Sequence, residues 1–247
     1  MELGGKNPCI IDKDANLKKT ARRLVQGKFF NNGQTCIAPD HLYVHRDIKN
    51  HLVELVKDEI SRQFGEDPQQ SPDLARLIND KAFERINAYV KDADILIGGQ
   101  SDKADRYIAP TLIECKDEAL PVMQDEVFGP VLPVLEYDNL DELTERISKK
   151  DKPLALYYFT SNRKKIDKVI STIDSGGVGI NELLVHFVNN HLPFGGVGKS
   201  GMGAYHGKYS FNTFSRERAL VVSSTLFDIS VKFAPYKKRV RLLKKIL

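Results

Sequence analysis

The sequence predicts an α/β fold, with helices layered against a mostly parallel β-sheet. Strand-like and helix-like hydrophobic patterns alternate along most of the chain, which is typical of such folds. The 247 residues contain 41% hydrophobic side chains, enough to bury a sizeable core. No repeat, low-complexity tract or clear internal linker interrupts the alternation, so we expect one large domain.

Each expected element follows from a hydrophobic period of 2 residues for strands or 3.6 for helices. The first part of the chain predicts a strand at 7–15, a helix at 16–34, a strand at 41–48, helices at 48–64 and 74–93, and a strand at 94–100. The second part predicts strands at 131–137, 153–159 and 176–180, separated by helices at 140–149 and 162–173.

Charge and cysteine content exclude several classes of protein. The net charge is +4, and much of the excess lies in 237–247, KKRVRLLKKIL, so a nucleic-acid surface over the main body is disfavoured. Three cysteines without a C-x-x-C pair or zinc-like spacing argue against a disulfide framework and a metal site. The chain contains no apolar stretch of membrane-spanning length and no signal pattern, which predicts a cytoplasmic protein.

One cysteine lies in an unusual setting. Cys36 is part of NNGQTCIAPD, where it follows a helical pattern and lies on a loop or at the start of a short element. A free cysteine is most often a small buried hydrophobe, which is our interpretation of Cys9 and Cys115 in their apolar surroundings. The neighbours of Cys36 are polar and poor core fillers, and Gly33 permits close backbone approach. Cys36 is therefore a candidate nucleophile.

A candidate general base precedes this thiol. Glu2 stands before the glycine pair of MELGGKNP, 34 residues ahead of Cys36. Its position near the chain start also allows the opposite interpretation, in which the segment frays into water.

MELGGKNP and FNNGQTCIAPD resemble the glutamate and cysteine signatures of the aldehyde dehydrogenase superfamily. QDEVFGPVLPV resembles the family's E-x-F-G-P segment, and GGVGIN and LPFGGVGKSGMGAYHGKYSF resemble later signatures. The resemblance extends from Met1 to about Val222 and is strongest to the class 3 and fatty aldehyde dehydrogenase branch.

The resemblance implies a three-layer α/β/α catalytic domain. It further implies that Cys36 attacks an aldehyde to give a thiohemiacetal and then a thioester, which water activated by Glu2 hydrolyses to a carboxylic acid. The backbone N–H of Cys36 would be one donor to the developing oxyanion. Glu126 and Phe128 match the positions that contact the nicotinamide-side ribose and ring of NAD or NADP. The substrate would be a medium- or long-chain aliphatic aldehyde or an aromatic one.

In the family, a dinucleotide-binding domain precedes the glutamate motif, which here begins at residue 2. We therefore expect a truncated catalytic domain at 1–222, with weak cofactor binding and little or no dehydrogenase activity alone. A β-rich oligomerisation segment near 209–222 would pair with another copy as a homo-oligomer such as a dimer, or the chain would associate with a cofactor-binding chain. Residues 223–247 form a basic tail, expected as a solvated helical end rather than a membrane-surface helix.

Other functions remain open at this stage. The chain could be a non-catalytic oligomerisation partner or a gene remnant, or it could retain a thiol esterase activity through Cys36. A papain-like hydrolase is less well supported, because no signature of that family surrounds the cysteine.

Two further motifs have simpler interpretations. The G-K-S triplet at 198–200 is not a phosphate-binding loop, because Pro193 stands where the motif needs glycine; a glycine-rich turn of the catalytic pocket is favoured. His186, His191 and His206 share no carboxylate spacing, so they are expected to be solvated or hydrogen-bonded side chains rather than metal ligands.

Overall fold

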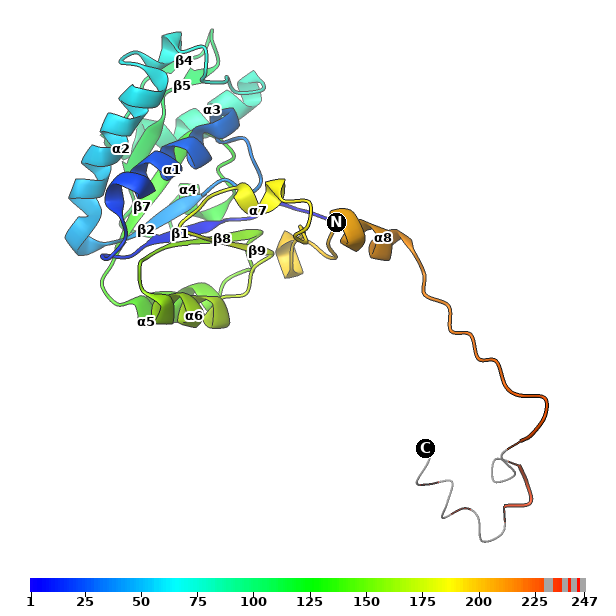
Figure 1. The fold of residues 1–247 in the computed structure, drawn as a ribbon. Helices are drawn as coiled ribbons and strands as arrows, with labels where there is room; N and C mark the ends of the chain where they lie inside the picture. Colours follow the sequence, from blue (N-terminus) through cyan, green and yellow to red (C-terminus); the bar gives the residue numbers. More distant parts are fainter. Residues whose placement is uncertain (229–232, 237–239, 241–243, 245–247) are drawn as a thin grey trace. The chain divides into compact units, whose positions relative to one another are not determined.

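The computed structural model describes residues 1–228, 233–236, 240 and 244, and the chain forms two compact units, Met1–Phe214 and Ser215–Leu247. A seven-stranded sheet organises the first unit, in the order β3-β6-β7-β2-β1-β8-β9 (Figure 1). All neighbours pair in parallel except β3 and β6, which confirms the predicted mostly parallel sheet. The strands are β1 Pro8–Ile11, β2 His41–His45, β3 Asp94–Ile97, β6 Thr111–Glu114, β7 Val131–Tyr137, β8 Ala155–Phe159 and β9 Gly177–Ile180.

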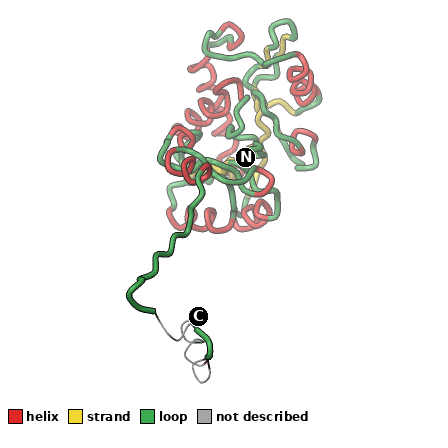
Figure 2. The backbone as a smooth tube through the Cα atoms, turned by 90° about the vertical axis from the view of Figure 1, so that its right-hand side faces the viewer, coloured by secondary structure: helices red, strands yellow, loops and turns green. Residues whose placement is uncertain are grey.

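Helices cover both faces of this sheet, and Figure 2 shows them around the strands. Alternation along β1 divides the core: Cys9 and Ile11 pack in one apolar cluster, whereas Ile10 packs in the other. The first cluster includes α1 Leu17–Phe29 and α2 Lys49–Phe64, and the second includes α3 Asp80–Lys91, α5 Leu140–Ser148 and α6 Arg163–Thr172. The predicted three-layer α/β/α architecture is confirmed.

Two helices depart from their expected bounds for local reasons. The helix expected at 74–93 begins at Asp80, because the Asn79 side chain accepts a hydrogen bond from the Ala82 N–H and caps it there. Helix α1 ends at Phe29 instead of continuing to residue 34, because Asn31 and Asn32 adopt left-handed φ angles of 49° and 56°.

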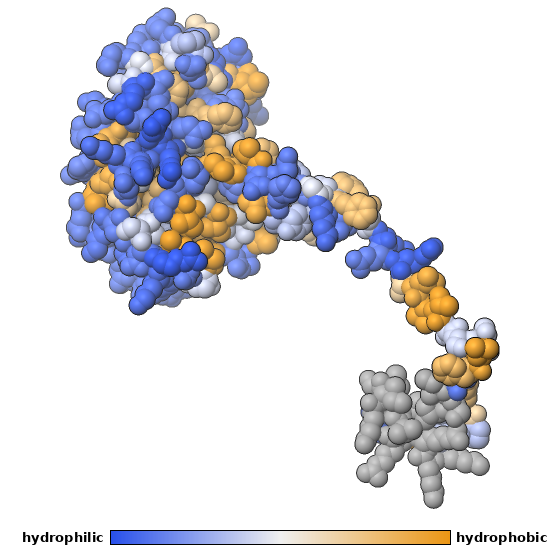
Figure 3. Space-filling view, in the orientation of Figure 1, coloured by the Kyte–Doolittle hydropathy of each residue, from blue (hydrophilic) through white to orange (hydrophobic). Residues whose placement is uncertain are grey.

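Short elements complete the first unit. They are the hairpin β4 Ser101–Asp102 with β5 Tyr107–Ile108, helices α4 Pro121–Gln124, α7 Val185–Val188 and α8 Gly207–Phe214, and 3₁₀ turns at Phe30–Gly33, Arg46–Ile48, Pro68–Gln70 and Gly198–Ser200. On the face shown in Figure 3, hydrophilic side chains cover most of this unit, and apolar ones gather near α7. Among these apolar residues, Val185, Phe187 and Val188 are exposed.

The segment near 209–222 differs from the β-rich expectation. Its first residues belong to helix α8, where the Ser210 hydroxyl accepts from the His206 N–H and the Thr213 hydroxyl donates to the Tyr209 carbonyl. No described strand includes residues 215–222, since a strand requires a neighbour with which to pair. The start of this segment is therefore helical, with the His206 N–H satisfied by the Ser210 side chain.

Much of the basic tail expected at 223–247 lies outside the described residues, so its helical character stays a prediction. Within the part of the chain that the structure describes, no helix combines the length and apolar character needed to cross a bilayer.

The parallel strands give the sheet two distinct edges. Residues that precede β1, β2 and β7 meet at the amino-terminal edge, and residues that follow β1, β2 and β8 meet at the carboxyl-terminal edge. Glu2, Cys36 and Glu126 all precede their nearest strand and therefore belong to the amino-terminal edge.

Candidate active site

Cys36 lies on a tight turn between α1 and β2. The Ala38 N–H donates to the Thr35 carbonyl at 2.9 Å, so Cys36 occupies the first central position of the turn. The Cys36 side chain is half-buried, whereas Cys9 and Cys115 are buried, as expected for structural cysteines. Of the three thiols, Cys36 alone is thus accessible enough to meet a substrate.

Close backbone packing fixes the approach to this turn. Gly33 has φ +73°, and a Cβ atom there would lie 2.2 Å from the Gly129 carbonyl oxygen. Only glycine fits both the conformation and the contact. The side-chain Nε2 of Gln34 donates to the Asn31 and Arg76 carbonyls, and its Oε1 accepts from the Ile78 N–H. The cysteine turn is therefore held by the α2–α3 connection as well as by its own chain.

Glu2 is anchored by the glycine-rich turn, contrary to the fraying interpretation. The Leu3 N–H donates to the Ser200 carbonyl at 3.0 Å, and the Met202 N–H donates to the Met1 carbonyl at 2.8 Å. Glu2 forms an antiparallel bridge with Gly201, and the Tyr205 hydroxyl lies 3.4 Å from Glu2 Oε2. This places the G-K-S turn beside the candidate base, as the glycine-rich interpretation predicted.

The Glu2 carboxylate influences the ionisation of the Cys36 thiol. Burial raises the pKa of Cys36 to about 12, and the hydrogen bond to Glu2 together with the Glu2 and Glu126 charges adds to the effect. The thiol is therefore protonated at neutral pH, and the Glu2 carboxylate is close enough to influence its ionisation. The Cys36 backbone N–H faces the sulfur and counteracts part of this increase.

Glu126 lies against the glycine pair Gly4–Gly5. A Cβ atom on Gly4 would approach Glu126 Oε2 to 2.7 Å, so the absence of a side chain there makes room for the carboxylate. Burial and the Asp40 charge raise the pKa of Glu126 to about 7, while the Gly5 N–H, Lys28 and Lys6 oppose the increase. Glu126 is therefore close to half-ionised near neutral pH.

The segment that carries Glu126 is fixed by ion pairs and carbonyl contacts. Lys6 Nζ pairs with Asp40 and donates to the Val122 and Asp125 carbonyls at 2.8 and 3.0 Å. Asp40 Oδ1 accepts from the Val127 N–H at 2.8 Å. These contacts join residues before β1, before β2 and before β7.

Phe128 follows Glu126 in a left-handed conformation, with φ 46°, and its ring is 39% exposed. A carboxylate acceptor beside an exposed aromatic ring fits a group that combines ribose hydroxyl donors with a flat ring. The Glu126 carboxylate and the Phe128 ring are therefore compatible with the nicotinamide half of a dinucleotide.

Sequence reasoning missed Lys28 in this site. Lys28 is only 1% exposed at the end of α1, and burial lowers its pKa to about 8, although the Asp40 and Glu126 charges oppose the decrease. A lysine in the last turn of an amphipathic helix usually lies in solvent, so no sequence signal marked it as buried.

His186 and His206 pack among aromatic rings, and His206 contacts Tyr205, whose hydroxyl lies near Glu2. The His186 ring packs between Tyr157 and Phe194, and His206 stacks on Phe194. Within the described residues, no group of three His, Cys, Asp or Glu side chains could hold a metal ion.

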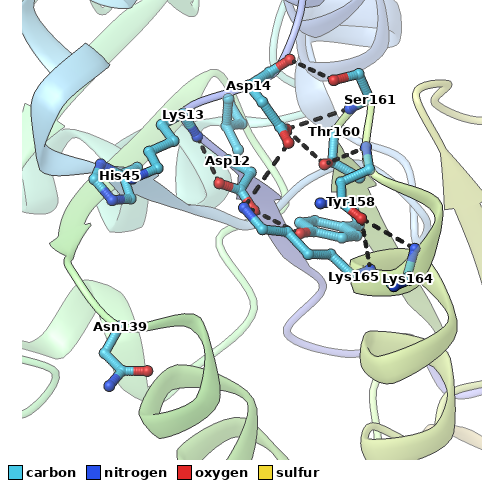
Figure 4. A network of polar contacts seen from close by, with 12 residues as sticks. Asp12, Lys13, Asp14, His45, Asn139, Tyr158, Thr160, Ser161, Lys164 and Lys165 are labelled. Carbon is cyan, nitrogen blue, oxygen red and sulfur yellow. Dashed lines mark hydrogen bonds and ion pairs between the residues drawn. The ribbon is translucent and has the colours of Figure 1, made fainter.

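The carboxyl-terminal edge carries a different polar cluster, shown in Figure 4. Buried Asp12 accepts from Lys165 Nζ and from the Tyr158 hydroxyl, both at 2.7 Å, and Asp14 accepts from the Thr160 hydroxyl at 2.6 Å. The contacts with Lys165 and Tyr158 hold the pKa of Asp12 below its usual range, although burial acts in the opposite direction. We call Asp12, Asp14, Tyr158, Thr160 and Lys165 the carboxyl-edge network.

The sequence profile of the aldehyde dehydrogenase family matches residues 1–220. The chain is 48% identical over 226 residues to a dimeric NADP-preferring aldehyde dehydrogenase of Rattus norvegicus, covering 92% of this chain and 50% of that protein. It is 47% identical over 224 residues to aldehyde dehydrogenase family 3 member A2 of Macaca fascicularis, covering 91% of this chain and 46% of that protein.

Solved structures of aldehyde dehydrogenases also match this chain. The substrate-bound state of Staphylococcus aureus AldH matches with a TM-score of 0.95 and 42% identity, over 99% of this chain and 54% of that one. An NAD-dependent aldehyde dehydrogenase from Sinorhizobium meliloti matches with a TM-score of 0.77 and 31% identity, over 87% of this chain and 44% of that one. The chain spans about half the length of the curated relatives and solved structures that it matches.

Proposed function

This chain belongs to the aldehyde dehydrogenase family, and on that premise we propose that it carries the nucleophile and the general base that oxidise an aldehyde to a carboxylic acid. The proposal rests on the half-buried position of Cys36, on the anchoring of Glu2 by the glycine-rich turn, and on the influence of the Glu2 carboxylate, which raises the pKa of the thiol. Cys36 is the nucleophile, and Glu2 is the base.

The residues of this chain account for the proton and acyl steps. Glu2 accepts the thiol proton as the Cys36 sulfur attacks the carbonyl carbon, and a thiohemiacetal forms. The Cys36 backbone N–H donates to the oxygen that gains charge. Glu2 then passes the thiol proton to the oxygen of the adduct and is ionised again. Oxidation of the adduct to a thioester removes a hydride, for which the cofactor assigned below would be the acceptor, and releases the hydroxyl proton to solvent. Glu2 then takes a proton from water, the hydroxide attacks the acyl carbon, and the sulfur leaves as a thiolate that recovers this proton as the acid is released.

Glu126 and Phe128 are the residues that we assign to the cofactor, NAD or NADP. When bound, its nicotinamide supplies the hydride acceptor. Glu126 accepts hydrogen bonds from the ribose hydroxyls, and Phe128 contacts the ring side. Because these two residues lie on the nicotinamide side, we expect the 247-residue chain to bind the dinucleotide weakly. Millimolar or weaker affinity in calorimetry would agree with this, and submicromolar affinity would contradict it.

The substrate that we propose is an apolar aldehyde, either aliphatic with a medium or long chain or aromatic. Exposed apolar side chains gather beside the turn that anchors Glu2, including Val197, Met202 and Tyr205. A relative in Staphylococcus aureus, 43% identical over 99% of this chain, is named 4,4'-diaponeurosporen-aldehyde dehydrogenase.

Association with another chain is also part of the proposal, either as a homo-oligomer or with a cofactor-binding chain. The word dimeric in the name of the rat relative supports the first form. We propose residues 1–222 as the catalytic region, with 209–222 at the contact, residues 223–247 as a basic tail, and a cytoplasmic location that fits the free thiols.

A thiol esterase activity is a second candidate, and the same Cys36–Glu2 pair favours it. The test is hydrolysis of p-nitrophenyl acetate by the chain, by Cys36→Ala and by the control Cys115→Ala, with NADH formation from an aliphatic aldehyde measured in parallel. Ester cleavage that depends on Cys36 but not on Cys115 supports the proposed nucleophile. NADH formation adds the dehydrogenase activity. A folded chain whose ester cleavage is unaffected by Cys36→Ala contradicts both candidates.

A further inference from the structure

Two consecutive residues before β1, Lys6 and Asn7, contact different halves of the proposed site. Successive side chains of an extended segment point to opposite sides, so neighbours in sequence reach separate partners. Lys6 reaches toward the segment of Glu126, and Asn7 reaches toward the turn of Cys36.

Asn7 uses its whole amide to join the cysteine turn to strand β8. Its Nδ2 donates to the Cys36 carbonyl at 2.7 Å and to the Ala38 carbonyl at 3.0 Å, and its Oδ1 accepts from the Ala155 N–H at 2.8 Å. The side chain is 1% exposed. It therefore joins both ends of the Cys36–Ala38 stretch to the start of β8, and no water competes for these contacts.

Lys6 acts on the other half. Its ammonium group pairs with Asp40 and donates to the carbonyls of Asp125 and Val122, which precede Glu126 by one and four residues. Asp40 is 3% exposed and holds the Val127 N–H on the far side of Glu126. The Lys6–Asp40 pair thus clamps the backbone on both sides of the carboxylate.

We propose that Asn7 and Lys6 are positioning residues with separate tasks, Asn7 for the Cys36 thiol and Lys6 for the Glu126 carboxylate. The inference rests on the proposed roles of Cys36 and Glu126 and adds how one short segment places both. Neither residue contacts the reacting atoms itself, so each acts through the backbone that it holds.

The chain offers a matched control for each residue at the carboxyl-terminal edge. Asn181 also uses both ends of its amide on backbone groups, accepting from the Thr160 N–H at 2.9 Å and donating to the Thr160 carbonyl at 2.8 Å. Lys165 also pairs with a buried aspartate, Asp12. Substitutions at these sites remove similar contacts far from the thiol.

The experiment measures two properties in each of four variants. Neither measurement requires enzymatic turnover, so both can be interpreted even if the chain shows no dehydrogenase or esterase activity. The variants are Asn7→Ser, Lys6→Met, Asn181→Ser and Lys165→Met. The first readout is the pH profile of Cys36 alkylation by iodoacetamide, with Cys36→Ala as the blank. The second is the titration of Glu126 by NMR of ¹³C-labelled glutamate carboxyls, assigned with Glu126→Gln.

We expect Asn7→Ser to loosen the cysteine turn and expose the thiol, which lowers its pKa. Alkylation at pH 8 then rises about tenfold or more, because each unit of pKa changes the thiolate fraction tenfold, and the Glu126 midpoint stays in place. We expect Lys6→Met to raise the Glu126 midpoint, because an opposing positive charge is lost, and to change alkylation less than about twofold. Lys6→Arg should restore the midpoint.

Three results would overturn the proposal. In the first, Asn7→Ser and Lys6→Met each change both Cys36 alkylation and the Glu126 midpoint. In the second, Asn7→Ser leaves alkylation unchanged and Lys6→Met leaves the Glu126 midpoint unchanged. In the third, the controls Asn181→Ser and Lys165→Met produce the same changes. Circular dichroism and thermal melting of every variant separate these results from global unfolding.

Discussion

The two edges of the sheet carry polar groups of similar kinds in opposite states. At the carboxyl-terminal edge, buried Asp12 has both a lysine and a tyrosine hydroxyl as donors, which stabilise its charge. At the amino-terminal edge, Cys36 and Glu126 are held in their neutral forms more strongly than usual. The carboxyl-terminal edge therefore stabilises the charge of its buried aspartate, whereas the amino-terminal edge combines the Lys6–Asp40 ion pair with a thiol and a carboxyl group whose pKa values are raised.

The stabilising network around Asp12 and the reactive groups Cys36 and Glu126 thus lie at opposite ends of the same strands. In open parallel sheets, ligands generally bind beyond the carboxyl ends of the strands, where the carboxyl-edge network lies in this chain. Here the cysteine, both carboxylates and the glycine-rich turns gather at the other end. The location of the proposed site follows from the turns that precede the strands.

The largest expected effect is chemical. Cys36→Ala should reduce ester hydrolysis at least about a hundredfold, since the activated nucleophile is lost, and Cys115→Ala should leave it within about twofold. Initial rates on p-nitrophenyl acetate measure this. Equal losses in the two variants would mean that the amino-terminal edge is not the reactive one.

The second effect is on stability at the opposite edge. Asp12→Ala removes the partner of Lys165 and Tyr158 inside the fold and should lower the free energy of unfolding by about 3 kcal/mol. Because the pKa of Asp12 is lowered in the folded state, its contribution is present at neutral pH and is lost as pH falls through that lowered pKa. Urea unfolding at pH 7 and at pH 3 checks both statements.

The alkylation rate per folded Asp12→Ala molecule should remain that of the native chain. A change in Cys36 reactivity with this variant would show that the two edges are coupled, contrary to the comparison.

The smallest effect concerns Glu126. Its pKa is raised in the folded state, so its contribution to stability is present at low pH and is lost as pH rises through about 7. Glu126→Gln should therefore stabilise the chain at pH 8 but not at pH 4, by on the order of 1 kcal/mol after allowance for solvent screening. Thermal unfolding at the two pH values measures this, and Glu145→Gln on the exposed face of α5 is the control.

Sequence alone predicted the family and the layered fold because both depend on patterns that are local in the chain. The motifs around Glu2 and Cys36 contain the glycines that their backbone requires, such as Gly33 against Gly129. Strand β6 was not predicted, although it is as long as β1, β3 and β9, which were. Helix α8 covers the first residues of the segment that was expected to be β-rich, and the Ser210 hydroxyl accepts from the His206 N–H at its start.

The supporting residues of the site were harder to predict for a physical reason. Asn7 contacts residues 29, 31 and 148 positions away, and the contacts of Lys6 span 34 to 119 positions. Contacts between residues so far apart produce no hydrophobic period in the sequence. Lys28 is buried by the same tertiary packing, although its sequence position resembles a solvated helix end.

The measurement that tests the central claim most directly is the pH profile of Cys36 alkylation in the native chain beside Glu2→Gln. In the native chain, alkylation should increase steeply with pH across the alkaline range, because the pKa of Cys36 is raised to about 12. Glu2→Gln should move this profile to lower pH, because the variant removes a carboxylate that holds the thiol proton. Superimposable profiles would show that Glu2 and Cys36 do not form a pair, which contradicts the proposed active site.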